Sequence, residues 1–264
     1  MGSGKFDIYV FANWSGLKGP VFIGTLSAHF AKGKKAFSFE YDKNWLKTDA
    51  QQLLDPDIAF YSGPQYPPSK ENFGIFLDSM PDTWGKTLMK RQVAHEARAK
   101  NEKAKTLYDI DYLLRVHDES RMGALRFKIE MDGPFLDNNT EKPVPPWTSL
   151  GELQDAVNLL ENEDQSDAIK KWLAVLIAPG SSLGGARPKA NILDASKNIW
   201  IAKFPSKTDV VDKAAWEFLA YQLAIASGIE MAESKIEKLR GQYHTFLTKR
   251  FDRENGARIH FASA

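Results

Sequence analysis

Alternating apolar and polar positions dominate the first forty residues of the chain. The segments FDIYVFA, VFIGTLSAHF and KAFSFEY alternate within residues 5–42, with Gly19-Pro20 between the first two. A period of two is typical of half-buried strands, so this region is predicted to form strands. Residues 50–68 are rich in proline and are predicted to form a loop.

After Pro81-Asp82 the hydrophobic period changes to that of a helix. Trp84, Leu88 and Val93 recur at helical spacing, which predicts a helix after this dipeptide. Further along, YDIDYLLRV is predicted to form a short helix and MGALRFKIE a strand. His117-Asp118, between these two segments, is expected to lie in a turn.

A proline-rich segment near the middle of the chain predicts a domain boundary. Residues 132–147, DGPFLDNNTEKPVPPW, end in three closely spaced prolines. We therefore predict an N-terminal domain over residues 1–135, a linker over 136–148 and a second domain over 149–264. Ser149 and Glu152 have the spacing of a capping box, which predicts a helix at about 149–162. A second helix is expected over DAIKKWLAVLIAPG.

The loop SSLGGARPKA at residues 181–190 combines adjacent glycines with two cations. Such a loop can hold a phosphate, because glycine lets backbone N–H groups approach an anion closely. Taken alone, however, such a loop is more often a hairpin turn or a turn that ends a helix. It lacks the G-x-G-x-x-G pattern, and Ala186 stands where the Walker A spacing needs a lysine.

The neighbours of this loop follow the order of a protein-kinase N-lobe. KANILD and NIWIAKF are predicted to form a hairpin, with Lys203 near its end. The next segment, DVVDKAAWEFLAYQLAIASG, is predicted to be a helix that Gly228 ends, and Glu217 lies 14 residues after Lys203. Two strands, ESKIEKL and YHTFLTKRF, follow. In kinases a glycine loop covers the phosphates, a strand lysine holds them, and a helix glutamate orients the lysine.

The apolar face predicted for that helix consists of Trp216, Leu219, Ala220 and Leu223.

Composition narrows the classes of protein further. The formal net charge is +1, so no overall field attracts nucleic acid, and we expect no direct contact with DNA. The absence of cysteine excludes disulfides, thiolate metal sites and a cysteine nucleophile. No signal peptide or membrane-spanning apolar run is present in the sequence, and the chain is expected to be cytoplasmic without membrane contact.

Several motifs resemble those of the HipA family of bacterial toxin serine/threonine kinases. In the second half these are GGARPKA, IAKFP, WEFLAYQLAIASGIE and KRFDR. In the first half VFIGTLS, FGIFLDSMPDTWGKTLMKR and RMGALRF resemble that family's N-terminal subdomain. The resemblance spans roughly residues 7–262. It implies an α+β fold, with a β-rich N-terminal subdomain before a kinase-like N-lobe built from a glycine loop, antiparallel strands and one αC-like helix.

The resemblance also implies an activity and partners. It implies a kinase of a toxin–antitoxin system that uses ATP and Mg²⁺, phosphorylates a protein such as an aminoacyl-tRNA synthetase, and binds a HipB-like DNA-binding antitoxin. Carried over by position, the residues implied to bind ATP are Gly184, Gly185, Ala186, Lys203, Glu217 and Phe251, the last at the hinge. Ser182 matches the autophosphorylated serine, with Ser181 as the adjacent alternative.

The carboxylates needed for phosphoryl transfer are not found in the sequence. None of the five histidines has an aspartate two residues later, as the H-x-D-x-x-x-x-N pattern requires. We therefore predict no catalytic residue or metal ligand in this chain, and expect it to be truncated, with these groups beyond residue 264. An alternative is a non-catalytic binding module that pairs with an antitoxin or a kinase. A third alternative is a globular α+β protein that is unrelated to kinases. Under each of these alternatives, Phe76 and Trp84 are expected to pack in the core.

Overall fold

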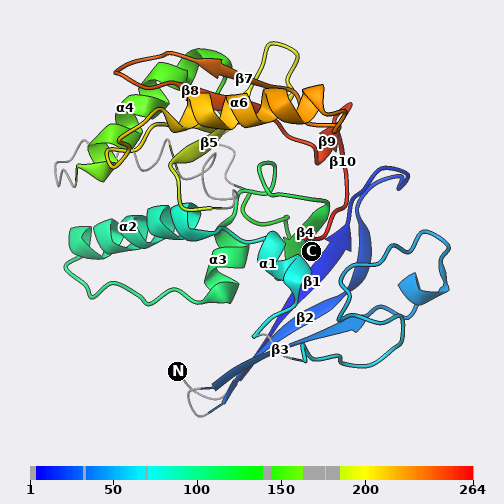
Figure 1. Cartoon of the computed structure of the whole chain (residues 1–264). Coiled ribbons are helices and arrows are strands. Elements are labelled where there is room, and N and C mark those ends of the chain that lie inside the picture. Colours follow the sequence, from blue (N-terminus) through cyan, green and yellow to red (C-terminus); the bar gives the residue numbers. More distant parts are fainter. Residues whose placement is uncertain are drawn as a thin grey trace.

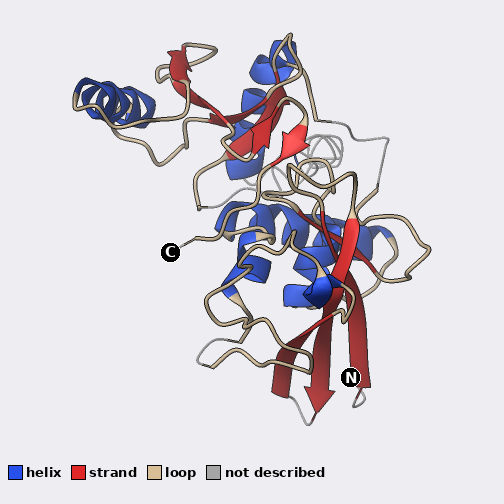
Figure 2. Cartoon of the chain, turned by 90° about the vertical axis from the view of Figure 1, so that its right-hand side faces the viewer, coloured by secondary structure: helices blue, strands red, loops and turns tan. Residues whose placement is uncertain are grey.

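The computed structural model describes residues 4–31, 34–68, 71–138, 144–162, 176 and 185–263. Two antiparallel sheets lie in different parts of the molecule, and helices occupy the space between and around them (Figure 1). The view turned by 90° shows the same separation (Figure 2). No helix among the described residues is both long and apolar enough to cross a membrane.

The first sheet has the strand order β3-β2-β1-β4, and all its pairs are antiparallel. Its strands are β1 (Gly4–Ala12), β2 (Val21–Ala31), β3 (Lys34–Tyr41) and β4 (Leu125–Lys128). Ile8 pairs with Leu26, and Leu26 pairs with Phe39, so the apolar positions of three strands fall on one buried face. The strands predicted from the alternating pattern are confirmed.

Three helices cover this sheet: α1 (Gly74–Asp78), α2 (Thr83–Ala99) and α3 (Asp109–Arg115). A short 3-10 helix spans Trp45–Lys47. The helix predicted after Pro81-Asp82 is confirmed, and the Asp82 side chain accepts a hydrogen bond from the backbone N–H of Thr83 at 2.7 Å. Phe76 is fully buried among the aromatic side chains of the first core, as expected.

The second sheet has the strand order β5-β6-β8-β7 and is also antiparallel. Its strands are β5 (Lys189–Leu193), β6 (Ile199–Lys203), β7 (Ser234–Glu237) and β8 (Thr245–Lys249), and it is accompanied by α4 (Leu150–Glu161) and α6 (Lys213–Ala226). The predicted β5–β6 hairpin and both helices are confirmed. The helix predicted over residues 167–180 lies outside the described residues except for Leu176, which is buried.

The start of α4 differs from the expected capping box. Ser149 has helical backbone angles and its side chain makes no capping hydrogen bond. The reason is that a 3-10 turn, Trp147–Ser149, runs directly into α4 and leaves no extended residue to act as a cap.

Helix α2 joins the two cores. Its Met89 packs in the first core, whereas Trp84 and Leu88 pack in the second core with side chains of α4, β5, β6 and β8. The indole Nε1 of Trp84 also donates to the carbonyl of Lys189 on β5 at 2.9 Å. The second core therefore contains residues from well before the proline-rich segment. The boundary at residues 136–148 stays a prediction.

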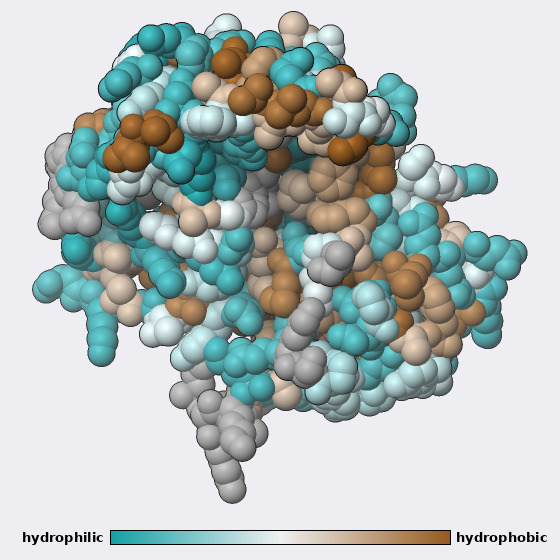
Figure 3. Space-filling model, in the orientation of Figure 1, coloured by the Kyte–Doolittle hydropathy of each residue, from teal (hydrophilic) through white to brown (hydrophobic). Residues whose placement is uncertain are grey.

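Helix α6 carries its apolar face toward solvent, unlike an ordinary core helix. Trp216 is 64% exposed and Leu223 59% exposed, and Ala214 alone is buried among the residues of this helix. Hydrophobic residues gather over this part of the surface in the space-filling view (Figure 3). The half-buried Phe218 and Tyr221 lie on a different side of the helix, which packs toward β7 and β8.

A short hairpin near the end of the chain was not predicted. It is formed by β9 (Arg253–Glu254) and β10 (Ala257–Arg258). Asn255 and Gly256 connect the strands with φ angles of 49° and 81°. Two positive φ values are the signature of a type I′ turn, for which Asn-Gly is the preferred sequence. The signal was therefore present in the sequence.

Candidate functional site

An ion pair joins the second sheet to α6. The Nζ of Lys203, at the end of β6, donates to Oε1 of Glu217 on α6. Both side chains are partly exposed, and the Lys203 amine also lies 5.2 Å from the centre of the Phe246 ring. The structure thus brings together the strand lysine and the helix glutamate that the sequence had paired.

Helix α6 is held at its first turn by Asp212. One carboxylate oxygen of Asp212 accepts from the backbone N–H of Ala215 at 3.0 Å, and the other lies 2.5 Å from Nδ1 of His244, next to β8. Burial acts to raise the pKa of Asp212, but the hydrogen bonds from His244 and Ala215 outweigh it and lower the pKa. This contact fixes the helix that carries Glu217.

A second lysine lies beside Lys203, and the sequence interpretation had not assigned it a role. Lys189 on β5 is the antiparallel register partner of Lys203 and is only 5% exposed. Burial, followed by repulsion from Lys203, lowers the pKa of Lys189 to about 8. The signal available in the sequence was its position inside the GGARPKA motif.

Gly185 is the described end of the glycine loop, and its backbone conformation favours glycine. Its φ is +83°, and a Cβ atom there would lie 2.8 Å from Nζ of Lys189. Its N–H donates to Oδ2 of Asp82 at 2.6 Å, and its carbonyl accepts from the N–H of Trp84 at 3.2 Å. The bond from Gly185 is the main cause that lowers the pKa of Asp82. The loop is thereby tied to the start of α2.

The other predicted loop residues are distributed as follows. Ala186 is exposed next to Gly185, whereas Gly184, Ser181 and Ser182 lie outside the described residues. Arg187 forms two hydrogen bonds with the Asp209 carboxylate, at 3.0 and 2.7 Å. This bidentate pair connects the loop to the segment before α6.

Phe251 lies in a separate hollow. It is 56% exposed, and its ring centre is 5.0 Å from that of Phe261. Both rings line a cavity of about 460 Å³, together with Asp82 and Lys86. Asp82 therefore borders both this hollow and the glycine loop.

The described part of the chain holds no group of three or more His, Asp or Glu side chains placed to bind a metal ion.

Part of this site lies in a segment that matches a known protein family. Residues 181–264 match the family of HipA-like C-terminal domains, a range that contains Gly185, Lys189, Lys203 and Glu217. A search of curated protein sequences finds no significant match.

Among solved structures, the chain is similar to HipA of Shewanella oneidensis MR-1, determined in a toxin–antitoxin complex with HipB and its operator DNA. The TM-score is 0.51 at 18% identity, which shows a shared fold over 94% of this chain. The chain spans 51% of the length of that HipA. The family match therefore covers the last third of the chain, and the likeness to HipA over the rest of the chain is one of fold.

Proposed function

We propose that the chain binds ATP through its glycine loop, Lys203 and Lys189, as the nucleotide-binding part of a HipA-like toxin serine/threonine kinase. The observation that carries this proposal is the ion pair between Lys203 and Glu217, next to a glycine loop whose end is tied to α2. This is the arrangement by which kinases position a lysine for the phosphates.

The residues at the site fit a triphosphate. Lys203 and Lys189 are adjacent cations that face each other on two neighbouring strands. Glu217 would orient Lys203 toward the phosphates, and the small residues Gly185 and Ala186 would let the loop backbone approach them. ATP would supply the phosphoryl group for transfer to a protein hydroxyl.

The complete activity requires groups that we expect in the other half of a longer protein. Transfer needs a carboxylate at the attacking hydroxyl and ligands for Mg²⁺. The chain spans about half the length of the Shewanella HipA, which is consistent with this division. In the longer protein we propose phosphorylation of a protein such as an aminoacyl-tRNA synthetase, autophosphorylation at Ser182, and control by a HipB-like antitoxin.

The binding of ATP is tested by calorimetry with the chain and its Lys203→Met variant. Losing one charged contact to the phosphates should weaken ATP binding about tenfold or more. Lys238→Met, in the segment after β7, is the matched control and should leave the affinity unchanged. Equal affinity of the wild-type chain and Lys203→Met would contradict the proposal.

A second candidate function is a non-catalytic module that pairs with another protein. The observation that favours it is the exposed apolar face of α6, which includes Trp216, Leu219 and Leu223. If this face binds an antitoxin, the double variant Trp216→Glu/Leu223→Glu should abolish formation of that complex in sedimentation velocity while ATP binding persists. An unchanged complex would remove this candidate.

A further inference from the structure

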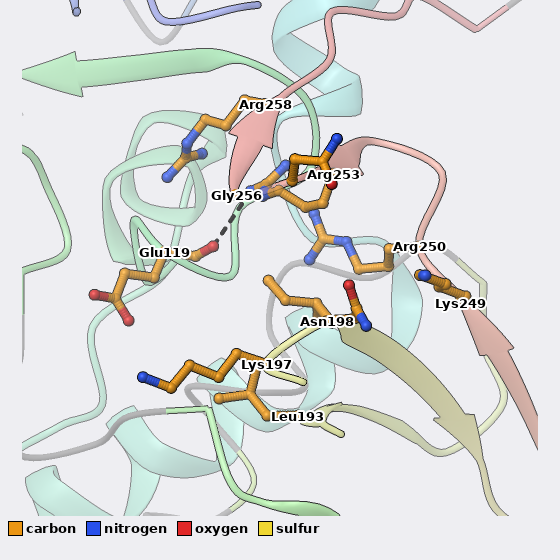
Figure 4. A pocket seen from close by; sticks show the side chains of 11 residues that line it. Glu119, Leu193, Lys197, Asn198, Lys249, Arg250, Arg253, Gly256 and Arg258 are labelled. Carbon is orange, nitrogen blue, oxygen red and sulfur yellow. Dashed lines mark hydrogen bonds between the residues drawn. The ribbon is translucent and has the colours of Figure 1, made fainter. Parts of the chain in front are cut away.

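A cationic cavity lies at the end of the second sheet, away from Lys203. Its volume is about 330 Å³, at the lower limit of small-molecule pockets. Among the residues that line it are Glu119 and five cations, Lys197, Lys249, Arg250, Arg253 and Arg258 (Figure 4). Ile199 begins β6 and Lys203 ends it, so the two sites are about 13 Å apart along the strand.

The arginines of this cavity also connect the segment after β8 to residues 119–121, which precede β4. Arg250 donates to the carbonyls of Ser120 and Arg121, at 2.7 and 3.1 Å. Arg253 donates to the carbonyl of Arg121 at 2.7 Å and to that of Glu119 at 3.2 Å, the bond drawn in Figure 4. These bonds hold the guanidinium groups in fixed positions.

Positive charge exceeds negative charge around the cavity. Asp252 pairs with both Arg250 and Arg253, at 2.6 and 2.7 Å. Asp118 pairs with Arg258 at 3.5 Å. Five cations therefore line the cavity, and three carboxylates, those of Asp118, Glu119 and Asp252, lie near them. The Asp118 carboxylate also pairs with Arg126, which does not line the cavity.

The pKa values of two of these arginines are lowered. Burial, followed by repulsion from Arg250 and then Arg258, lowers the pKa of Arg253 to about 9. The pKa of Arg258 is lowered to about 10, again by burial first. An anion in the cavity would relieve both effects, because it stabilises the charged form of its neighbours.

Hydrogen-bond donors remain for such an anion. Arg258 is 9% exposed, and its Nη1 has no hydrogen-bond partner among the described residues. Lys197 and Lys249 form no ion pair with any other residue of the described ranges. In Figure 4, Lys197 borders the cavity on one side, and Arg253 and Arg258 border the opposite side.

We propose that this cavity binds the phosphate group of a small molecule, with Lys197 and Arg258 as its main hydrogen-bond donors and Arg253 adding positive charge. A phosphate carries close to two negative charges near neutral pH and several acceptor oxygens, which matches an excess of cations with guanidinium donors. The surrounding volume leaves room for a small substituent on the phosphate. The site is independent of the proposed ATP site.

The test is binding of inorganic phosphate and of ribose 5-phosphate to the whole chain, measured by calorimetry at low and high salt. Saturable binding that weakens as salt rises is expected. Lys197→Met should weaken it about tenfold, because one charge-assisted contact is lost. Lys197 lies in an exposed turn, so this variant should fold, and Lys43→Met is a matched exposed control. Tighter binding of ribose 5-phosphate than of phosphate assigns the site to phosphate esters, and equal binding assigns it to free phosphate.

Two results would overturn the proposal. The first is absence of saturable binding of either compound. The second is binding that survives Lys197→Met but is lost in Lys203→Met, since phosphate would then occupy the proposed ATP site. Conversely, if Lys203→Met loses ATP but keeps phosphate binding, the two sites are separate. Failure of ATP to bind the wild-type chain leaves the expected result for this cavity unchanged.

Discussion

Lys189 and Lys203 lie directly opposite each other on the antiparallel strands β5 and β6. Two like charges in this position repel, and Lys189 is also buried. Glu217 pairs with Lys203, and Asp82 and Glu217 both act to raise the pKa of Lys189, yet the net effect is a pKa lowered to about 8. Two lysine side chains therefore face each other at the place where an anionic ligand is proposed.

Replacing the buried Lys189 should change the stability of the chain and its affinity for ATP in opposite directions. Lys189→Met removes the repulsion and the burial of a charge, so the free energy of unfolding at pH 7 should rise by about 1 kcal/mol or more. ATP affinity should fall about tenfold in the same variant. Urea denaturation and calorimetry measure the two effects. A variant that loses both stability and affinity would indicate a purely structural role for Lys189.

The same lysine predicts a pH dependence. Because its pKa is lowered from 10.5 to about 8, the unfolded chain holds this proton more tightly than the folded one. The destabilisation by Lys189 is therefore complete below about pH 8 and is relieved as pH rises from about 8 to about 10.5. The stability difference between Lys189→Met and the wild-type chain should shrink over this window in urea titrations. A constant difference from pH 7 to pH 10 would contradict the lowered pKa.

The hydrogen bond from Gly185 to Asp82 should hold the end of the glycine loop in place. Asp82→Ala removes the acceptor for Gly185 and the hydrogen bond to Thr83 at the start of α2, so stability should fall by about 1–2 kcal/mol. Hydrogen exchange at Gly185 should accelerate, because its N–H loses its partner. Asp49→Ala, at an exposed position, is the control. Unchanged exchange at Gly185 would show that the loop is held by other contacts.

Asp252 should be essential to the contact between the segment after β8 and the loop before β4. Its fully buried carboxylate pairs with Arg250 and Arg253 and accepts from the N–H of Gly123 at 2.7 Å. Although burial acts to raise the pKa of Asp252, hydrogen bonds from Arg250 lead the effects that lower it. Asp252→Ala leaves buried cations unpaired and should cost about 3–5 kcal/mol in urea denaturation.

Asp252→Asn keeps a side-chain acceptor and should be less destabilising than Asp252→Ala. This milder variant allows measurement if Asp252→Ala does not fold. A loss of under 1 kcal/mol for both variants, the level of a surface ion pair, would mean that the junction does not depend on this carboxylate.

The strands and helices of this chain were largely predictable because their signals are local. The alternation over residues 5–42 fixed which face of each strand is apolar, and the change of period after Pro81-Asp82 marked α2. The Asn-Gly signal at residues 255–256 was equally local but was not used. Lys203 and Glu217 were paired from their order along the chain and a family resemblance, and the fold brings them into contact.

The sequence by itself therefore determined most of the described strands and helices, the residues expected at the glycine loop and the resemblance to the HipA family. Tertiary structure alone decided that Lys189 lies opposite Lys203, that α2 packs in both cores, and that buried arginines gather around Asp252. The tertiary structure also leaves the apolar face of α6 exposed, although the spacing of its apolar residues is typical of a core helix. The physical reason is that periodicity reports which residues share a face, whereas the neighbour of that face depends on contacts between distant segments.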